Sequence, residues 1–337
     1  MYKPENQSEV ENVVIIGSGP AGMAASSYLI QNGYKVDVFE KNDRVGGLMI
    51  YGIPNFKLDK SIVERRTQWL IKSGVKFHVN KEIGKEISFQ DLEKNYDAIL
   101  IATGVYKARK LDLETSNINN SLPALDFLIE SNKVGLGDVP SSNKNLNAKD
   151  KNVVVIGGGD TAMDCVRTAI RQKAKEVTCL YRRNKENMPG SAREVLNAEQ
   201  EGIKFNWLSV PSKIISKNFQ ATSLSYKVAT LGEADESGRR KPIDTGIEKQ
   251  IKSDLIIQAL GFEPEDLNSH FNTDLELTSW NTLKVNYQKF QTSNPKVFAA
   301  GDIVRGASLV VWAIHDGREV AKSINQFLQT NKVKKAS

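Results

Sequence analysis

A stretch near the start of the chain, residues 13–40, limits most strongly what the chain can fold into. It opens with four β-branched residues, Val13 to Ile16, a run typical of a strand buried on both faces of a parallel sheet. Three glycines follow in the spacing G-x-G-x-x-G: Gly17, Gly19 and Gly22. A helical stretch, a second strand and the acid Glu40 complete the pattern. Together these features predict a strand–turn–helix–strand unit that binds a dinucleotide.

The residues of this turn have distinct predicted roles. The first glycine permits the turn, the second lets the backbone approach a pyrophosphate, and the third packs the helix against the strand. N–H groups at the helix start, near Pro20 and Ala21, would face the phosphates at the positive end of the helix dipole. Glu40, followed by Lys41, is placed to accept hydrogen bonds from two ribose hydroxyls. An acid there fits a ribose without a 2′-phosphate, which means FAD or NAD.

The same pattern begins again 140 residues later, so the chain contains an internal repeat. Val153 to Ile156 form a predicted strand, and a Gly-rich turn follows at 157–162. Ala162 stands in place of the third glycine, and Arg182 and Arg183 stand in place of the acid. Loss of the acid and gain of two guanidinium groups is expected for a 2′-phosphate, so the second unit is predicted to bind NADPH. The alternative interpretation is two solvated surface arginines.

Other strand ends carry predicted contacts, because ligands of such sheets lie beyond the carboxyl ends of the strands. Ala102-Thr103-Gly104 follows one buried run, and Ala259 to Gly261 ends another. Gly301-Asp302 follows the last strand, and a helix is expected from near Ser308 to about Leu328. This return to the first unit favours FAD there. Asp302 would bond the ribitol or pyrophosphate region, and N–H groups of the helix start would face the flavin pyrimidine edge.

These patterns predict an α/β protein with two Rossmann-like dinucleotide-binding domains of the two-dinucleotide flavoprotein type. The NADPH-binding domain, residues 116–284, would be inserted in the FAD-binding domain, residues 1–115 and 285–337. A helix is expected over 61–72, and residues 131–150 are expected to form a loop. A polar excursion at 232–254 is expected to be a surface hairpin without function.

Composition excludes several other functions. The net charge of +6 is spread among acids, so no nucleic-acid-binding stripe is expected. The only cysteines, Cys165 and Cys179, form no C-x-x-C motif, so neither a redox dithiol nor a metal site is predicted. A buried pair of thiols suits a reducing cytosol. Neither a signal peptide nor a membrane span is visible, and a cytoplasmic location is expected.

Long motifs resemble those of the small (β) subunit of NADPH-dependent glutamate synthase, in the group that includes the FAD/NADPH module of dihydropyrimidine dehydrogenase. The matching stretches are GSGPAGMAAS at 17–26, FEKNDRVGGLMIYGIPNFKL at 39–58, IGGGDTAMDCVRTAIRQ at 156–172, CLYRRNKENMPGSAREVLNAEQEGIKF at 179–205, ALGFEPEDL at 259–267 and AAGDIVRGASLVVWAI at 299–314. The resemblance implies that electrons pass from NADPH to FAD and then through iron–sulfur clusters to a large subunit. That subunit makes two glutamates from glutamine and 2-oxoglutarate.

The residue pattern and the resemblance together predict two sets of cofactor contacts. The FAD contacts are Gly17, Gly19, Pro20, Ala21, Gly22, Glu40, Lys41, Gly47, Leu48, Ala102, Thr103, Gly104, Gly301, Asp302, Leu309 and Val310. The NADPH contacts are Gly158, Gly159, Asp160, Thr161, Ala162, Arg182, Arg183, Ala259 and Gly261. No catalytic side chain is expected, because the cofactors carry the chemistry. Lys57 is either a flavin neighbour or a solvated lysine.

The sequence departs from the family pattern in two places. The family's Cys-rich segment, which supplies cluster ligands, precedes the first strand, whereas here 12 residues without cysteine precede Val13. Cluster binding is therefore not carried over, and the chain is expected to be either part of a longer protein or a stand-alone flavin module. His315 stands where arginine is expected and is interpreted as a surface or half-buried residue.

Two other functions stay open on the same residues. One is an NADPH–ferredoxin or quinone reductase with a different acceptor. The other is a non-catalytic docking or redox-sensing subunit that binds FAD and NADPH for structure. A thioredoxin-reductase-like function is disfavoured because no C-x-x-C is present to receive electrons.

Overall fold

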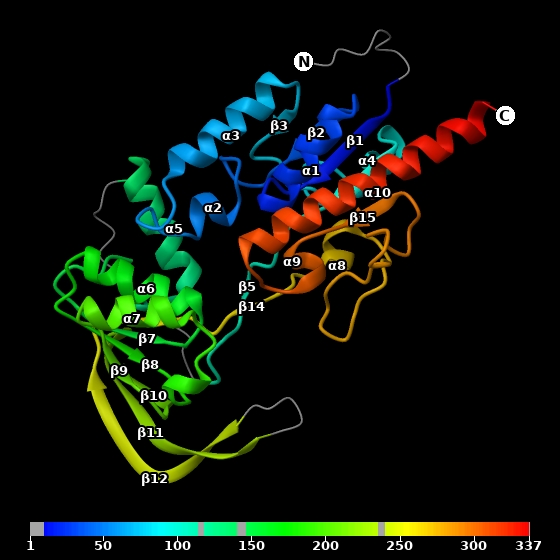
Figure 1. The fold of residues 1–337 in the computed structure, drawn as a ribbon. Helices are drawn as coiled ribbons and strands as arrows, with labels where there is room; N and C mark the ends of the chain where they lie inside the picture. The colour runs from blue at the N-terminus through cyan, green and yellow to red at the C-terminus, as the bar shows by residue number, and fades with distance from the viewer. Residues whose placement is uncertain (1–9, 114–117, 140–145, 235–239, 337) are drawn as a thin grey trace. The chain divides into compact units, whose positions relative to one another are not determined.

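The computed structural model describes residues 10–113, 118–139, 146–234 and 240–336 (Figure 1). The chain divides into two compact units that exchange segments. The first unit comprises Met1–Ile50, Leu58–Lys107 and Phe262–Ser337, and the second comprises Tyr51–Lys57 and Ala108–Gly261. Two short strands, β5 (Lys107–Ala108) and β14 (Phe262–Glu263), pair where the chain passes from one unit to the other.

The first unit is built on a parallel five-stranded sheet in the order β15-β4-β1-β2-β3. Its strands are β1 (Asn12–Ile16), β2 (Lys35–Phe39), β3 (Lys76–His78), β4 (Ala98–Ile101) and β15 (Val297–Ala299). Its helices are α1 (Pro20–Gln31), α2 (Leu48–Tyr51, whose last residue counts with the second unit), α3 (Lys60–Lys72), α4 (Phe89–Asn95), α8 (Leu267–Phe271), α9 (Asp302–Arg305) and α10 (Val310–Ala336). Parallel order brings the carboxyl ends of these strands to one edge.

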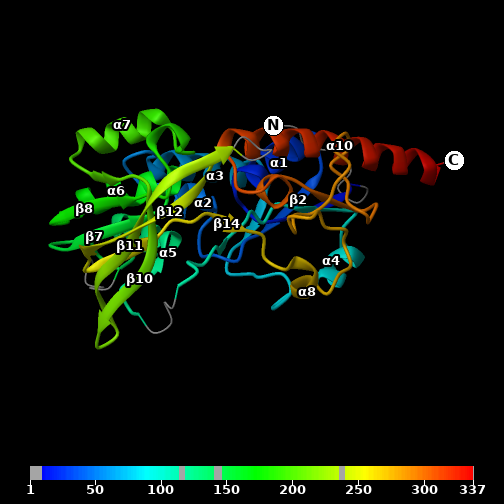
Figure 2. The same cartoon turned by 90° about the horizontal axis from the view of Figure 1, so that it is seen from below.

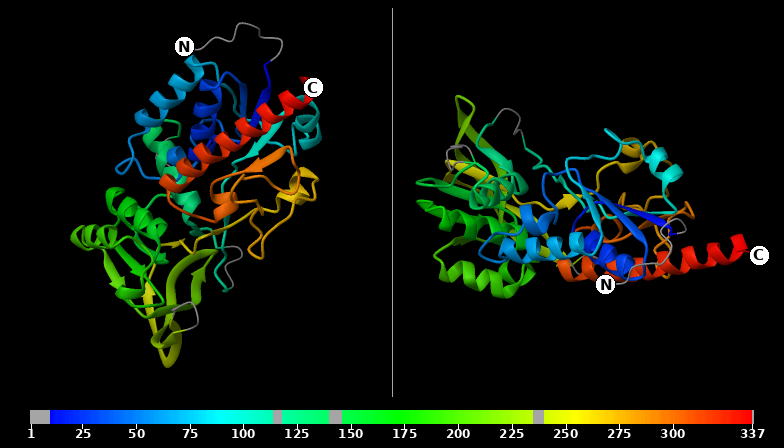
Figure 3. Two further views of the ribbon diagram at one scale, coloured as in Figure 1. Left: turned by 45° about the vertical axis from the view of Figure 1, so that its right-hand side comes forward. Right: turned by 90° about the horizontal axis from the view of Figure 1, so that it is seen from above.

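Helices cover both faces of this sheet. On one face α1 and α10 lie side by side (Figure 3). A side chain at Gly317 of α10 would place its Cβ 2.3 Å from the carbonyl oxygen of Ala21, so the two helices touch through backbone. On the other face Phe89 of α4 and Phe271 of α8 stack 5.4 Å apart and pack against β1 and β4.

The second unit has three layers (Figure 2). Its middle layer is a parallel sheet in the order β6-β13-β7-β8-β9, made of β6 (Ser121–Pro123), β7 (Asn152–Ile156), β8 (Glu176–Leu180), β9 (Lys204–Asn206) and β13 (Leu255–Gln258). One face carries α5 (Ala124–Leu136), α6 (Asp160–Arg171) and α7 (Ala192–Gln200), with a short 3₁₀ turn, η2 (Lys185–Asn187), beyond β8. The other face packs on an antiparallel sheet of β10 (Ser209–Lys217), β11 (Gln220–Ala234) and β12 (Arg240–Lys252).

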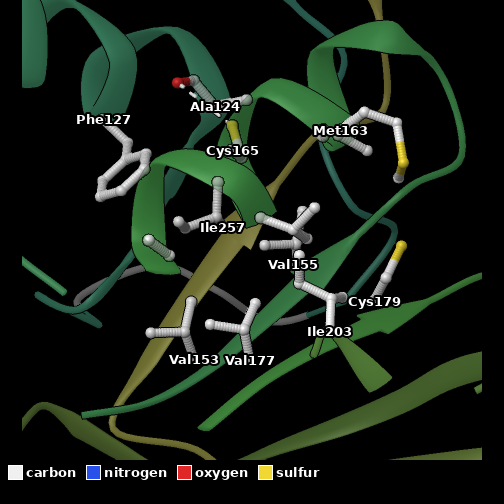
Figure 4. Packing of buried hydrophobic residues seen from close by; sticks show 14 of the residues in the cluster. Ala124, Phe127, Val153, Val155, Met163, Cys165, Val177, Cys179, Ile203 and Ile257 are labelled. Carbon is white, nitrogen blue, oxygen red and sulfur yellow. Dashed lines mark hydrogen bonds between the residues drawn. The ribbon is translucent and has the colours of Figure 1, made fainter. Parts of the chain in front are cut away.

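The core between the parallel sheet and the helices of the second unit contains both cysteines (Figure 4). Cys165 and Cys179 are fully buried and free. Burial raises the pKa of the Cys165 thiol well above its ordinary range and that of Cys179 to about 12. The expected buried pair of small apolar side chains is therefore confirmed.

The predicted α/β class and both dinucleotide-type units are confirmed, but several boundaries differ. The terminal helix α10 begins at Val310 rather than near Ser308 and continues to Ala336, past Leu328. The loop expected at 131–150 is wrong over 131–136, which belong to α5. The apolar residues that bury α5, including Phe127 and Leu128, precede the polar stretch that suggested a loop.

The compact units also differ from the predicted domain limits. Residues 262–284, predicted to belong to the NADPH domain, pack with the first unit, because Leu267 and Leu275 enter the core formed by β1 and β4. Residues Tyr51–Lys57, predicted in the FAD domain, pack with the second unit, where Nδ2 of Asn132 donates to the carbonyl oxygen of Tyr51. The assignment of one cofactor to each unit stays a prediction.

Candidate functional site

The Gly-rich turn after β1 requires glycine at two of its three positions. Gly17 has φ +102°, and a Cβ there would lie 2.4 Å from the carbonyl oxygen of Ala102. A Cβ on Gly22 would lie 2.1 Å from the carbonyl oxygen of Gly17. Gly19 is different, because it has φ −63° and its Cβ would meet nothing within 4 Å. The first and third glycines therefore serve the fold, and the second leaves open space beside the start of α1.

Glu40, 5% exposed, accepts four hydrogen bonds within the first unit. Its Oε2 accepts from Ser18 N at 3.1 Å and from Ser18 Oγ at 2.6 Å. Its Oε1 accepts from Asn42 N at 2.9 Å and from Asn42 Nδ2 at 2.8 Å. A carboxylate has about four acceptor positions, so a ribose would have to displace one of these donors. The side-chain amide of Asn42 is the donor that can turn away most easily.

The carboxyl ends of β4 and β15 add two polar groups at the same sheet edge, Thr103 and Asp302. The hydroxyl of Thr103 is buried and has no hydrogen-bond partner among the described residues. Burial raises the pKa of Asp302, although Ser308 Oγ donates to its Oδ1 at 2.9 Å. Buried polar groups usually have partners, so an unpartnered hydroxyl beside the Gly-rich turn fits a polar ligand there.

The loop that precedes α2 closes against the first turn. Gly46 and Gly47 both have positive φ, +126° and +53°, and a Cβ on Gly47 would lie 3.0 Å from Cα of Gly19. The backbone N–H of Gly46 donates to Ser18 Oγ at 3.0 Å. Ser18 therefore ties the loop to Glu40. The motif spacing did not reveal this role, because G-x-G-x-x-G leaves the residue at the first x unspecified.

Tyr106 is a second residue of this region that the sequence did not single out. The Nζ of Lys41 lies 4.9 Å from the centre of the Tyr106 ring. Burial, helped by the nearby carboxylates of Glu40 and Asp302, raises the pKa of its hydroxyl. Lys41 and Tyr106 thus lie close to Glu40, the residue predicted to hold a ribose.

The remaining predicted FAD residues occupy helix starts in the first unit. Pro20 and Ala21 open α1, and Leu48 opens α2. Leu309, 56% exposed, precedes Val310, the first residue of α10. Backbone N–H groups at helix starts lack intrahelical acceptors, so Ala21, Leu48, Leu309 and Val310 can donate to a ligand, whereas Pro20 has no N–H.

The second Gly-rich turn, after β7, shares the architecture of the first. Gly157 has φ +145°, and a Cβ there would lie 2.2 Å from the carbonyl oxygen of Ala259. A Cβ on Gly158 would lie 2.4 Å from the Tyr181 ring, whereas on Gly159 it would meet nothing within 4 Å. Ala162 is fully buried, so a methyl group is accommodated where the first turn requires glycine.

A segment between η2 and α7 closes over this second turn. The N–H of Gly190 donates to the carbonyl oxygen of Gly158 at 2.9 Å. The N–H of Ser191 donates to Oδ1 of Asp160, the first residue of α6, at 2.9 Å. Asp160 was predicted to contact NADPH, and here its carboxylate fixes the covering segment. The turn-forming run Met-Pro-Gly-Ser at 188–191 indicates a loop here, but it does not reveal that the loop covers the second turn.

The predicted 2′-phosphate arginines follow β8. Arg182 is exposed, and Arg183 is half-buried. The N–H of Leu208 donates to the carbonyl oxygen of Arg183 at 3.0 Å, and Nε of Arg183 donates to the carbonyl oxygen of Arg240 at 2.9 Å. At the end of β13, Gly261 has φ +88°. The second unit thus brings together the Gly-rich turn and the basic strand end.

Lys57 has two acidic partners in the second unit. Its Nζ lies 2.6 Å from Oδ1 of Asp164 and 2.6 Å from Oε2 of Glu194. Burial raises the pKa of Asp164 to about 6, and Lys57 opposes this shift only in part. The lysine is therefore not simply solvated, and these contacts give no support to a role beside the flavin, which stays a hypothesis.

Three expectations about other sites can be compared with the described residues. His315 is exposed, as expected, and meets the Trp312 ring edge-on at 6.1 Å. Across the described ranges no group of three or more His, Cys, Asp and Glu side chains could hold a metal ion. No helix in this part of the chain is long and apolar enough to span a membrane.

Two nucleotide-type turns of different chemistry on one chain define a class of dinucleotide-dependent oxidoreductases. Residues 11–317 match the family model of pyridine nucleotide-disulphide oxidoreductases, and the chain belongs to this family. Within it, the chain is of the glutamate synthase small-chain type. It is 51% identical to the glutamate synthase [NADPH] small chain of Azospirillum brasilense over 320 residues, which cover 94% of this chain and 66% of that protein.

One further relative agrees with this placement, and one solved structure shares the fold. The glutamate synthase [NADPH] small chain of Escherichia coli (strain K12) is 41% identical over 95% of this chain and 69% of its own length. The structure of Mycobacterium tuberculosis FprA in complex with NADPH superposes with a TM-score of 0.77 over 97% of this chain and 86% of that chain. At 18% identity this likeness shows the fold alone. This chain spans about two thirds of the length of these two curated relatives.

Proposed function

We propose that this chain is the electron-input module of a glutamate synthase, with FAD in the first unit and NADPH in the second. The observation that carries this proposal is the contrast between the ends of the two equivalent strands. Buried Glu40 follows β2, whereas the cations Arg182 and Arg183 follow β8. An acid suits a free ribose and two guanidinium groups suit a 2′-phosphate, so the two sites are suited to different nucleotides.

The residues of the first unit fit FAD on three counts. Gly19 leaves open space at the helix start, Thr103 offers an unpartnered hydroxyl, and Glu40 offers an acceptor oxygen when the side-chain amide of Asn42 turns away. The N-terminus of α10 would supply N–H groups and a positive dipole end to stabilise negative charge on a reduced flavin. When bound, FAD would accept a hydride from NADPH and release the two electrons to a further acceptor. The protein residues would bind and orient the cofactors.

The proposed partner is a large glutamate synthase subunit with iron–sulfur centres. Support comes from the two relatives, whose names state that they are small chains of NADPH-dependent glutamate synthase. Under this proposal the product is glutamate, made from glutamine and 2-oxoglutarate on the partner. A cytoplasmic location is part of the proposal, because NADPH oxidation and two free thiols both suit a reducing compartment.

An anaerobic titration tests the proposal directly. The chain reconstituted with FAD should lose its flavin absorbance near 450 nm (roughly, for a bound oxidised flavin) as one equivalent of NADPH is added. Addition of the large subunit with glutamine and 2-oxoglutarate should then restore the absorbance and form glutamate. A flavin that NADPH leaves oxidised would indicate a non-catalytic binding subunit. Reoxidation by ferredoxin or a quinone, without the large subunit, would favour the reductase alternative.

A further inference from the structure

The ribbon formed by β11 and β12 reaches back to the predicted NADPH site. Nε of Arg183 donates a hydrogen bond of 2.9 Å to the carbonyl oxygen of Arg240, which lies 57 residues further along the chain. Arg240 is the first residue of β12. The sequence suggested a surface hairpin without function here. Its return strand β12 nevertheless begins in contact with Arg183, one of the two arginines predicted to bind the 2′-phosphate.

Both the backbone and the side chain of Arg183 are held by hydrogen bonds. Its carbonyl oxygen accepts from the N–H of Leu208, and the carbonyl oxygen of Leu208 accepts from the N–H of Ala229 in β11 at 2.8 Å. Its side chain is held by β12 through the carbonyl of Arg240. Backbone and side chain are therefore both attached to the same antiparallel ribbon, and the start of β12 has a defined place beside Arg183.

The start of β12 is basic and exposed. Arg240 and Lys241 are both exposed; Arg240 supplies the carbonyl oxygen that Arg183 contacts, and Lys241 is the next residue. Consecutive side chains of a strand point to opposite faces, so one of the two can face the phosphate directly while the other adds its positive charge from the opposite face of the ribbon. Further along β12, the carboxylate of Asp244 pairs with Lys227 at 2.7 Å and so is engaged with another cation.

We propose that Arg240 and Lys241 belong to the 2′-phosphate site, where their positive charges add to those of Arg182 and Arg183. This inference rests on the proposed placement of NADPH in the second unit. The ligand class is an adenosine 2′-phosphate, and the effect is on discrimination between phosphorylated and unphosphorylated ribose. Exposed cations contribute modestly and lose influence as salt screens them.

Calorimetric titration with adenine nucleotides tests the proposal without reading catalytic activity. Adenosine 2′,5′-bisphosphate carries the 2′-phosphate. ADP, which has the same number of phosphates but both at the 5′ position, is the comparison ligand. The double variant Arg240→Ala/Lys241→Ala should bind the bisphosphate about 3- to 10-fold more weakly, with unchanged affinity for ADP. Lys249→Ala, a cation on the same strand away from Arg183, is the matched control and should behave as the unaltered chain.

Separate outcomes distinguish this inference from the proposed function. The variant Arg182→Ala/Arg183→Ala should weaken bisphosphate binding more strongly than the β12 variant. If both double variants bind the bisphosphate normally, the NADPH site itself is misplaced. If only the Arg182/Arg183 variant is weakened, the proposed function stands and the role of β12 is overturned. The charge-retaining variant Arg240→Lys should keep the affinity, and it separates loss of charge from loss of folding.

Discussion

The two Gly-rich turns show that residues with the same letter can serve different ends. A Cβ added at Gly17 or Gly22 would lie only 2.4 or 2.1 Å from a backbone carbonyl oxygen, whereas a Cβ at Gly19 would face open space. The motif spacing therefore does not distinguish Gly17 and Gly22, which the fold requires, from Gly19, which a bound ligand would require. This division can be tested one substitution at a time.

We expect Gly22→Ala and Gly19→Ala to fail in different ways. Gly22→Ala forces its new methyl group against the Gly17 carbonyl, and overpacking of this kind costs about 1–3 kcal/mol or more. Gly19→Ala should leave the free energy of unfolding of the FAD-free chain within about 1 kcal/mol, because φ is −63° and no atom is near. Its FAD content should fall instead.

Urea unfolding measures the stability of each variant, and flavin absorbance measures its FAD content. Normal FAD binding by Gly19→Ala would contradict the prediction that the backbone at Gly19 approaches the pyrophosphate.

At the scale of elements, α6, α7 and the segment Tyr51–Lys57 share a cluster of charges. Arg167 of α6 donates to Glu194 of α7 and to Glu201, the residue that follows α7. Lys57 contacts Asp164 and Glu194. The ring of Phe56 lies 3.8 Å from the guanidinium carbon of Arg171. The carboxylates of this cluster have shifted pKa values of opposite sign, so the cluster responds to acid in two separate ranges.

We predict that Asp164 makes the protein less stable as the pH rises from about 4 to 6. Burial raises its pKa to about 6, so the folded chain binds more protons than the unfolded chain in this window. Asp164→Asn should therefore flatten the decline of unfolding free energy between pH 4 and 6. Urea unfolding at several pH values measures this slope. An unaltered slope in the variant would show that the carboxyl group titrates normally.

Glu201 contributes in a different window and serves as the comparison for that experiment. Hydrogen bonds from Arg171 and Arg167 lower its pKa to about 2. A lowered pKa gives stability that is present above about pH 4.5 and is lost as the pH falls toward 2. Glu201→Gln should therefore change the profile below pH 4.5 and leave the range from 4.5 to 6 unaffected.

Elements with a strong local pattern were predictable from the sequence, and elements defined by distant partners were not. β-branched runs correctly indicated β1 and β7. The helix expected over 61–72 is α3, Lys60–Lys72, and its N-cap Asp59 accepts from Ser61 N. The helix α5 was missed because its second half contains Asn132 and Gly135, which favour a loop. Its stability comes from packing on the sheet, which no local pattern reports.

The candidate site followed the same division. Motif spacing identified the glycines and the charged strand ends, because turns and phosphates require particular residue types. It did not identify Ser18, Asn42 or Gly190, whose contacts depend on loops that close in three dimensions. The contact between Arg183 and Arg240 uses a backbone carbonyl, which every residue carries, so no side-chain pattern could have revealed it.

At the scale of the whole molecule, the chain passes between its two units four times, at residues 50/51, 57/58, 107/108 and 261/262. Neither unit is a continuous piece, so neither can be removed by a single cut. Each unit nevertheless has its own parallel sheet and its own core. Ligands that bind one unit should therefore stabilise that unit first.

Scanning calorimetry of the intact FAD-free chain should resolve this. We expect FAD to raise the melting temperature of one transition and adenosine 2′,5′-bisphosphate to raise that of another. At a ligand concentration of about 100 times Kd each gain approaches ~2.7 kcal/mol. ADP, as the control, should move the second transition less than the bisphosphate does. A single transition that both ligands raise equally would show that the two units unfold together.

The burial of Cys165 and Cys179 has a consequence for the lifetime of the protein during turnover. Under the proposed function this chain would hold a reduced flavin, and reduced flavins react with oxygen to give peroxide. Peroxide attacks thiolates, and susceptibility follows thiolate character and exposure. Both thiols are inaccessible, and burial raises the pKa of each. The chain has no other cysteine, so it contains no reactive thiol that this peroxide could oxidise.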